Sequence, residues 1–222
     1  MSTTTASRRS APSDRDLEFL SGASWGSVIA IVVIVAALAG AIGWWVGSPK
    51  APSTDSVDVG FLRDMIDHHD QAVQMSLLAL QPSANVNADV RGYAEEIITD
   101  QRFQIGQMQS WLEDWNVGLG DPGRQAMAWF KGMTPTTVAT MPGMQSAAAM
   151  TALRQATGSD FDRRFLAMMT QHHLGGIDMA TSAQAHASQA KVRALAQRVI
   201  SAQRGDIIDF RHLEQRLGFP VK

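Results

Sequence analysis

The stretch FLRDMIDHHDQAVQM, at residues 61–75, returns as FLAMMTQHHLGGIDM at residues 165–179. Phe, Leu, Met, both adjacent histidines and the final Met occupy the same places in the two copies. A second block follows each copy in the same order, VRGYAEEIITDQRFQI from Val90 and VRALAQRVISAQRGDI from Val192. Because two blocks recur in one order, the sequence predicts a tandem duplication of one structural unit.

Each unit has the periodicity of two amphipathic helices. In the second block of each unit, apolar residues recur at steps of three and four, or sums of these. They are Val90, Ala94, Ile97, Ile105, Met108, Leu112 and Trp115, and then Val192, Ala196, Val199, Ile207, Phe210 and Leu217. Helices are therefore expected at about 59–80, 87–117, 159–187 and 189–217, with Gly118 ending the second and Gly218 and Pro220 ending the fourth.

These helices predict an all-α fold, since no segment has a convincing strand pattern. Four long helices from a duplicated plan indicate a ferritin-like four-helix bundle at residues 59–219, made of two tandem helix-pair repeats. The repeats are expected at 59–117 and 159–219. A Met-containing crossover at 118–158 joins them, with a short helix near its end, and a connection of this length is typical of ferritin-like bundles.

Composition excludes several functions. The formal net charge is −2 and no basic stripe is present, so nucleic-acid binding is not expected. There is no cysteine, which excludes disulfides, zinc–thiolate sites, iron–sulfur clusters and thiol catalysis. The 12 methionines are the only soft ligands in the chain, although methionine also fills irregular gaps in a core.

The N-terminal segment predicts a membrane anchor. No charged residue lies between 19 and 49, and a helix at 25–47 is long enough to cross a bilayer, with Trp44 and Trp45 at one interface. A single segment of this kind predicts a single pass of the bacterial cell membrane, and arginines at positions 8, 9 and 15 precede it. By the positive-inside rule the tail, residues 1–24, is then cytoplasmic, and a linker at 48–58 leads to an extracytoplasmic C-terminal domain. The alternative is a cleaved signal peptide.

The repeated histidine doublet lies on the core-facing side of its helix. On a helical wheel, Met65, His68, His69 and Met75 share one arc with the apolar residues. A buried imidazole without a partner costs about 1–3 kcal/mol, and coordination of a metal removes this cost. Imidazole with thioether sulfur favours Cu(I) or Cu(II). The candidate metal ligands are His68, His69, His172, His173, Met65, Met75, Met169 and Met179.

Other residues are weaker candidates. Gln101 and Gln203 are placed to hydrogen-bond the non-ligating ring nitrogens, or simply to cap a polar neighbour. Met141 and Met144, in the crossover, are an auxiliary metal pair or loop filling. His186 and His212 stand alone and are expected to be structural. No acidic residue pattern matches a di-iron site, so an enzyme is not expected.

The segments MIDHHDQAVQM, AEEIITDQRFQIGQMQSWL, MPGM and ATGSDFDRRFLAMMTQHH resemble the bacterial ferritin-like family called domain of unknown function 305. The resemblance covers residues 59–218 and implies an exported four-helix bundle; one cyanobacterial relative is regarded as a periplasmic copper-binding protein. It marks the same eight candidate ligands and the Met141–Met144 pair. The chain departs from the family pattern at Asp67, Gln104 and Phe210, where the pattern has Pro, Glu and Met.

The sequence therefore favours a membrane-anchored, exported protein that binds copper for buffering, resistance or delivery. One alternative is a structural accessory subunit that docks on a membrane complex such as a respiratory oxidase, with Trp111, Trp115 and Trp129 as interface anchors if they are exposed. A redox enzyme using the same histidines ranks last. The sequence leaves the metal's identity and a homo-oligomer open.

Overall fold

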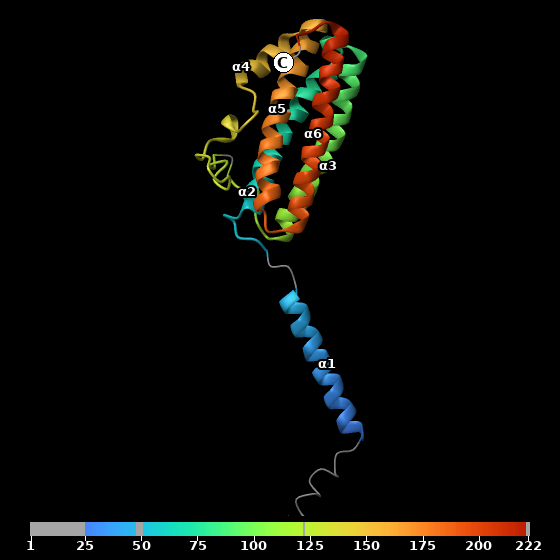
Figure 1. Ribbon diagram of the computed structural model, residues 1–222, viewed down its shortest axis with the longest axis vertical. Helices are drawn as coiled ribbons and strands as arrows, with labels where there is room; N and C mark the ends of the chain where they lie inside the picture. The colour runs from blue at the N-terminus through green and yellow to red at the C-terminus, as the bar shows by residue number, and fades with distance from the viewer. Residues whose placement is uncertain (1–24, 48–50, 122, 221–222) are drawn as a thin grey trace, which may run out of the picture. The chain divides into compact units, whose positions relative to one another are not determined.

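The structure, a computed structural model, describes residues 25–47, 51–121 and 123–220 (Figure 1). The chain divides into two units, Met1–Lys50 and Ala51–Lys222, and each is described by itself. The predicted cytoplasmic tail, with its three arginines, and the first residues of the predicted linker lie outside the described residues.

The first unit contains one described helix, α1 (Trp25–Gly47). Its segment Trp25–Gly43 has a mean hydropathy of 2.5 and no buried side chain. Within the described part of the chain, this is the one helix with the length and composition of a membrane span, and a signal sequence near an N-terminus has the same properties. The side chains of Trp44 and Trp45, the predicted interface pair, lie outside the described ones.

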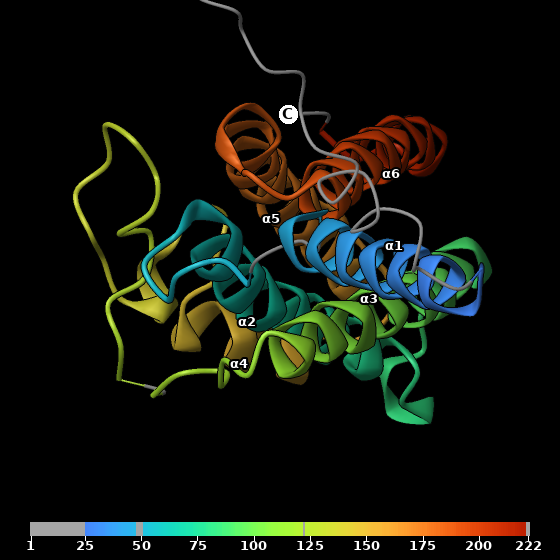
Figure 2. The same ribbon diagram turned by 90° about the horizontal axis from the view of Figure 1, so that it is seen from below.

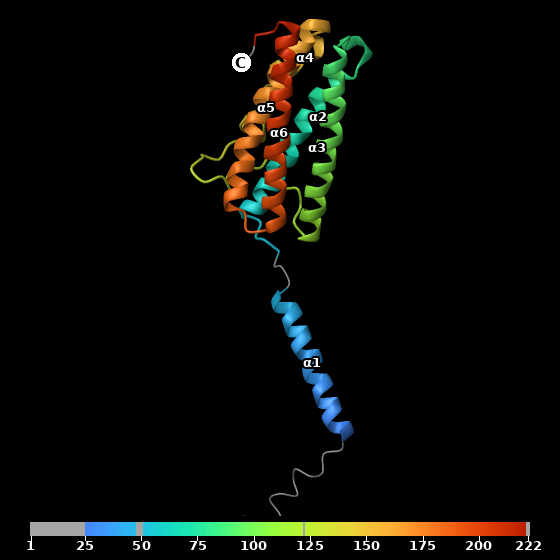
Figure 3. The ribbon, with the colours of Figure 1, turned by 45° about the vertical axis from the view of Figure 1, so that its right-hand side comes forward.

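The second unit is a bundle of four long helices, which confirms the predicted all-α fold. They are α2 (Val57–Ala79), α3 (Ala88–Asp114), α5 (Gly158–His186) and α6 (Ala190–Leu217). Figures 1 and 3 show them side by side; α2 packs along α3, α5 along α6, and α2 against α5. The described residues contain no strand, only an isolated bridge between Ala126 and Thr136.

Short helices occupy the connections. The turn between α2 and α3 contains η3 (Pro82–Ala84), and the crossover between the repeats contains η4 (Val138–Thr140) and α4 (Ala147–Gln155). Viewed along the bundle, the crossover lies beside α2, on the side away from α6 (Figure 2). It therefore covers one face of the bundle and leaves the α3–α6 face open.

The helix ends follow the duplication, with one correction. The expectation that Gly118 ends the second helix is wrong, because α3 stops at Asp114 and the left-handed residue is Asn116, with a φ of 55°. The Val117 N–H then donates to the Leu112 carbonyl over 2.8 Å, so this carbonyl in the last turn of the helix has a hydrogen-bond donor. Gly218, with a φ of 71°, ends α6 as expected.

Each repeat caps a turn of the other repeat through a buried aspartate. Asp58, at the start of α2, accepts hydrogen bonds from the backbone N–H groups of Ser188 and Gln189, at 3.0 and 2.8 Å, where α6 begins. Asp162, the equivalent residue of α5, accepts the Asn87 N–H at 3.1 Å, where α3 begins. The two hairpins are therefore tied together reciprocally at both ends of the bundle.

The apolar core is divided into two clusters. The first cluster joins the first turns of α2 and α6 to the last turns of α3 and α5, and includes Phe61, Met65 and Met179. The second cluster joins the opposite ends of the same helices and includes Met75 and Phe165. Neither cluster contains residues of the middle turns, where buried histidines and glutamines lie instead. A polar layer thus crosses the centre of the bundle.

Candidate metal centre

The four predicted histidines meet in this polar layer. His68 and His69 come from α2, His172 and His173 from α5, and all four side chains are fully buried. The His68 and His172 rings lie nearest the middle, with centroids 3.8 Å apart and a tilt of 35°. Because α2 and α5 pack against each other, the two equivalent doublets come together inside one bundle.

Hydrogen bonds fix the tautomers of His68 and His173. The His68 Nε2 atom lies 3.1 Å from the carbonyl oxygen of Pro142, and the His173 Nε2 atom lies 2.8 Å from the carboxylate of Asp206. A carbonyl oxygen and an ionised carboxylate only accept, so both Nε2 atoms carry the hydrogen. In the neutral form of each ring, the Nδ1 atom then has a free lone pair.

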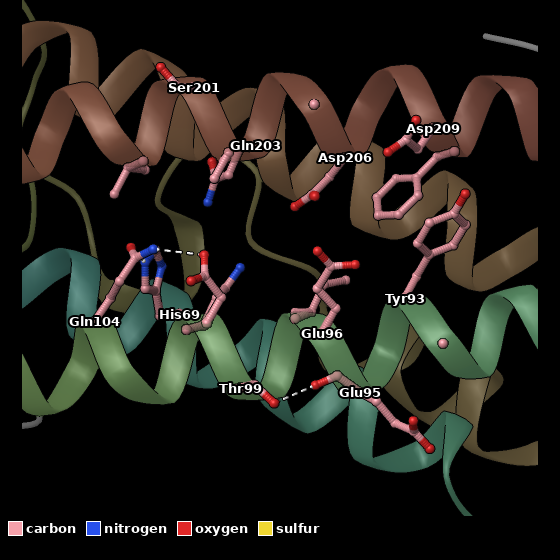
Figure 4. Close-up of a pocket in the computed structure, with 18 residues that line it drawn as sticks. His69, Tyr93, Glu95, Glu96, Thr99, Gln104, Ser201, Gln203, Asp206 and Asp209 are labelled. Atoms are coloured by element: carbon pink, nitrogen blue, oxygen red, sulfur yellow. Dashed lines mark hydrogen bonds between the residues drawn. The ribbon is translucent and has the colours of Figure 1, made fainter.

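His69 reaches the same state through Gln104. Its Nε2 atom lies 2.9 Å from the Gln104 Oε1 atom, while the Gln104 amide nitrogen donates to Asp100 at 3.0 Å (Figure 4). The bond to Asp100 orients the amide with its oxygen toward the imidazole, so His69 Nε2 is the donor. Its Nδ1 atom, like those of His68 and His173, is buried and has no hydrogen-bond partner.

His172 is the one ring of the four without a hydrogen bond to either of its nitrogens, although both are buried. An unpaired buried polar atom costs about 1–3 kcal/mol, and such groups are rare in folded proteins. Several buried ring nitrogens without hydrogen bonds therefore lie close together at the centre of the bundle.

His68, His69 and His172 are neutral at physiological pH, because the pKa of each is lowered. Burial lowers the pKa of His68 from 6.5 to about 3, and repulsion from His69 adds to this effect. Burial also lowers the pKa of His69 to about 4, although the hydrogen bond to Gln104 opposes it. The pKa of His172 is lowered as well, mainly by burial and then by repulsion from His68. Neutral imidazole is the form that binds a metal without first losing a proton.

The predicted methionines do not surround the histidines as one set. All four are fully buried, but Met65 and Met179 belong to the first cluster and Met75 and Met169 to the second. This follows from antiparallel packing, which brings the start of one repeat's helix to the end of the other's. Thioether sulfurs therefore lie on both sides of the histidine layer.

The Met141–Met144 segment of the crossover reaches the centre directly. Pro142, which accepts the His68 hydrogen bond, lies between the two methionines; Met141 is buried and Met144 is half-buried against the first cluster. The segment fits closely on α5, because a Cβ on Gly175 would come within 2.2 Å of the Pro142 carbonyl oxygen. The absence of a side chain at Gly175 is what allows this approach.

The predicted glutamines lie in the layer but do not bond the rings. Gln101 Oε1 and both amide atoms of Gln203 are buried without a partner. The ring partners are Gln104 and Asp206, one turn further along α3 and α6. Sequence analysis did not identify these two as partners, yet aligning the second blocks of the repeats pairs Gln104 with Asp206, as it pairs Gln101 with Gln203. His186 and His212 are exposed, away from the layer.

In the described residues, no three His, Asp and Glu side chains are arranged to hold one metal ion together. The donor set instead consists of paired imidazoles with bare Nδ1 atoms, flanked by thioethers. Imidazoles beside soft thioether sulfurs match Cu(I) and other soft cations, and do not match magnesium or calcium.

The tryptophans proposed as interface anchors are used within the bundle. Trp129 is buried and donates its Nε1–H to Asp64 at 2.7 Å. Trp111 and Trp115 are half-buried against the first cluster, and the Lys191 ammonium lies 4.9 and 4.6 Å from their ring centroids. Trp129 is therefore not exposed as the docking hypothesis requires, and Trp111 and Trp115 are only partly exposed.

The structure defines the class of protein: it is a bundle of two equivalent helical hairpins with four imidazoles buried between them. A family model for the domain of unknown function DUF305 matches residues 58–214. The chain belongs to the DUF305 family, and the predicted resemblance is confirmed.

Solved structures of the family share this fold. A DUF305 protein from Streptomyces coelicolor, described as secreted, is 30% identical with a TM-score of 0.69, and the match covers 77% of this chain and 99% of that one. A DUF305 fragment from Deinococcus radiodurans is 29% identical with a TM-score of 0.61, over 77% of this chain and 99% of that one.

A third protein, CopM, is similar as well. Its Cu(I)-bound form is 24% identical with a TM-score of 0.53, covering 72% of this chain and 96% of CopM. Its Cu(II)-bound form is 25% identical with a TM-score of 0.52, covering 72% and 97%. Among curated proteins, none matches the chain significantly.

Proposed function

We propose that the protein is an exported, membrane-anchored copper-binding protein, which takes up copper at the histidine layer for buffering, resistance or delivery. The observation that carries this proposal is the state of the imidazoles. Three rings donate Nε2–H to an oxygen and keep a bare, buried Nδ1 atom. Protein ligands of metals show this arrangement, in which the other ring nitrogen is held by a carbonyl or a carboxylate.

The inner pair, His68 and His172, is the proposed primary site. These rings are the closest of the four, and His172 has no competing hydrogen bond. Met65, Met169, Met75 and Met179 on either side, and Met141 and Met144 in the crossover, are proposed to supply sulfur, which would favour Cu(I) over Cu(II). His69 and His173 are proposed to bind in the same layer, held in orientation by Gln104 and Asp206.

Copper is proposed as cargo because the layer offers imidazole and thioether groups, which can bind a soft ion and release it again. The relatedness to CopM, which has been solved with Cu(I) and Cu(II), supports this choice of metal. A binding role needs only that the layer accept and release the ion. No specific observation favours the accessory-subunit alternative, since its proposed tryptophan anchors pack within the bundle.

The anchor completes the proposal. Residues 25–47 are proposed to span the cell membrane, with the tail at 1–24 in the cytoplasm and the bundle, after the linker at 48–58, outside. A phosphatase that is active only outside the cytoplasm, fused after Lys222, should be active in cells. Inactivity of that fusion, with full activity of a fusion to the N-terminus, would reverse the orientation.

Copper uptake by matched variants tests the site. Equilibrium dialysis with Cu(I) and Cu(II) should show binding by the wild type and loss of it in the double variant His68→Leu/His172→Leu, in which leucine keeps the core filled. The control His186→Ala/His212→Ala removes two exposed imidazoles and should bind as the wild type does. Circular dichroism verifies that each variant is helical. Equal copper uptake by the wild type and the core variant would end the proposal.

A further inference from the structure

A groove opens in the face of the bundle formed by α3 and α6. These two helices pack far less closely than the other neighbouring pairs, and side chains join them on either side of the groove. The joining contacts are Arg198 with Gln107 and Lys191 with Trp111 on one side, and Tyr93 with Phe210 and Arg216 with Asp89 on the other. Between them lies a cavity of about 710 Å³, at the level of the histidine layer (Figure 4).

The groove is acidic. Its walls carry five carboxylates and no lysine or arginine; the carboxylates are Glu95, Glu96, Asp100, Asp206 and Asp209. A concave surface lined by charges of one sign focuses the electric field and raises the local concentration of ions of the opposite sign. The groove therefore attracts cations to this face of the bundle.

The floor of the groove consists of buried polar groups without partners. Gln101 and Gln203 line the cavity and are only 4% and 3% exposed, and Gln101 Oε1 and both amide atoms of Gln203 lack a hydrogen bond. His69, with its unpartnered Nδ1 atom, lies on the same floor, next to Gln104 (Figure 4). The two amide oxygens and the His69 Nδ1 atom are ligands that a cation in the groove would meet before it reached the other imidazoles.

The opposite side of the histidine layer is closed by the crossover. A Cβ on Gly143 would come within 2.7 Å of the His172 carbonyl oxygen, and a Cβ on Gly175 would come within 2.2 Å of the Pro142 carbonyl oxygen. The backbones are thus in direct contact, and no space remains between them for an ion. The two faces of the layer differ: one is sealed by the chain, and the other opens to solvent through an acidic groove.

We propose that the α3–α6 groove is the route by which copper ions reach the histidine layer. Glu96 and Asp209 at the walls collect the cation, and the carbonyl oxygens of Gln101 and Gln203 carry it to the Nδ1 atom of His69. This inference rests on the proposed function, because it assumes that the layer takes up copper.

The charge of the walls is tested by kinetics with the full-length protein in detergent micelles. Cu(I), and in a parallel series Cu(II), is mixed with protein in a stopped-flow instrument, and uptake is followed by quenching of tryptophan fluorescence. Glu96→Gln/Asp209→Asn should lower the association rate constant about tenfold at low ionic strength, and the difference should shrink as salt is added. The control Glu113→Gln/Asp178→Asn removes the same charge from exposed sites away from the groove and should associate as the wild type does.

Obstruction of the groove gives a second, independent test. Gly205 lines the groove and has open space where a Cβ would lie, so Gly205→Leu should narrow the route without a clash. A plugged route slows association and dissociation by the same factor and leaves the Kd unchanged. Gly106→Leu is the control, because Gly106 also has open space but does not line the groove.

The outcomes separate this inference from the proposed function. Absence of copper uptake by the wild type would overturn both. Uptake by the wild type, with groove variants and controls that associate at equal rates, would overturn the route and leave the copper site standing. A raised Kd with an unchanged association rate would also overturn the route, since the groove residues would then act as ligands or as structural supports.

Discussion

Replacement of His172 by leucine should stabilise the metal-free protein while it abolishes copper binding. The imidazole of His172 is fully buried, and neither of its ring nitrogens has a hydrogen bond. Removal of the ring deletes two unmet polar groups, each of which costs about 1–3 kcal/mol. Exchange for a side chain of similar volume costs up to about 1.5 kcal/mol in packing. The net expectation is that the free energy of unfolding rises by about 2 kcal/mol.

Urea unfolding of the fragment 51–222, in buffer with a metal chelator at pH 7, measures this change. For an m-value of about 2 kcal/mol per molar urea, the midpoint should move upward by about 1 M. His69→Leu is the matched comparison, because that ring makes a hydrogen bond to Gln104. Its removal leaves the Gln104 carbonyl oxygen buried without a donor, and this cost offsets the gain from deleting the unpartnered Nδ1 atom. The packing cost of the exchange then remains, so stability should fall by up to about 1.5 kcal/mol.

The two variants are expected to shift the urea midpoint in opposite directions. If His172→Leu lowers the midpoint as much as His69→Leu does, then the His172 ring is not an unmet polar group and the reasoning about the layer is wrong. If the two variants move in opposite directions, the histidine layer is a functional feature maintained at the expense of stability.

Three further predictions follow from individual contacts. Folding lowers the pKa values of His68 and His69 from 6.5 to about 3 and about 4, so the unfolded chain binds more protons than the folded one below pH 6.5. The free energy of unfolding of the metal-free protein should therefore be full above pH 6.5 and about 4 kcal/mol lower at pH 5. Denaturation at several pH values measures this change, and a flat profile would contradict the burial of neutral rings. Asp58→Ala should cost about 3 kcal/mol in thermal or urea unfolding, since it strands backbone donors of the other repeat, whereas a loss under 1 kcal/mol would argue against the reciprocal caps. Gln104→Leu should weaken copper binding about tenfold or more by releasing His69, with Gln107→Leu as the control, and equal affinities would show that the orientation of this ring is unimportant.

The architecture was accessible from the sequence because it depends on repetition and periodicity. The apolar positions of the second block recur every three or four residues, so the helices and their buried faces could be assigned within a few residues. The placement of His68 on the core-facing arc followed from the same periodicity. Helical geometry alone decides which side of a helix a residue faces, and no knowledge of the neighbouring helix is required.

The partners of the rings could not be assigned in the same way. Gln101 and Gln104 lie one turn apart on the same side of α3, and both are buried. Only the axial offset between α2 and α3 decides which of them meets His69, and the sequence of either helix does not contain that offset. The cap formed by Asp58 on Ser188 depends on a contact across 130 residues, for which no local pattern exists.

The reciprocal caps have a consequence for the origin of the molecule. Each hairpin carries both halves of the joint: an aspartate at the start of its first helix, and, at the turn before its second helix, backbone N–H groups that donate to the aspartate of the other hairpin. A single hairpin therefore holds everything needed to pair with an identical copy around a twofold axis. Fusion of two such genes would have turned a symmetric dimer into one polypeptide. The two halves now differ in places where their sequences align, as they do at Gln104 and Asp206.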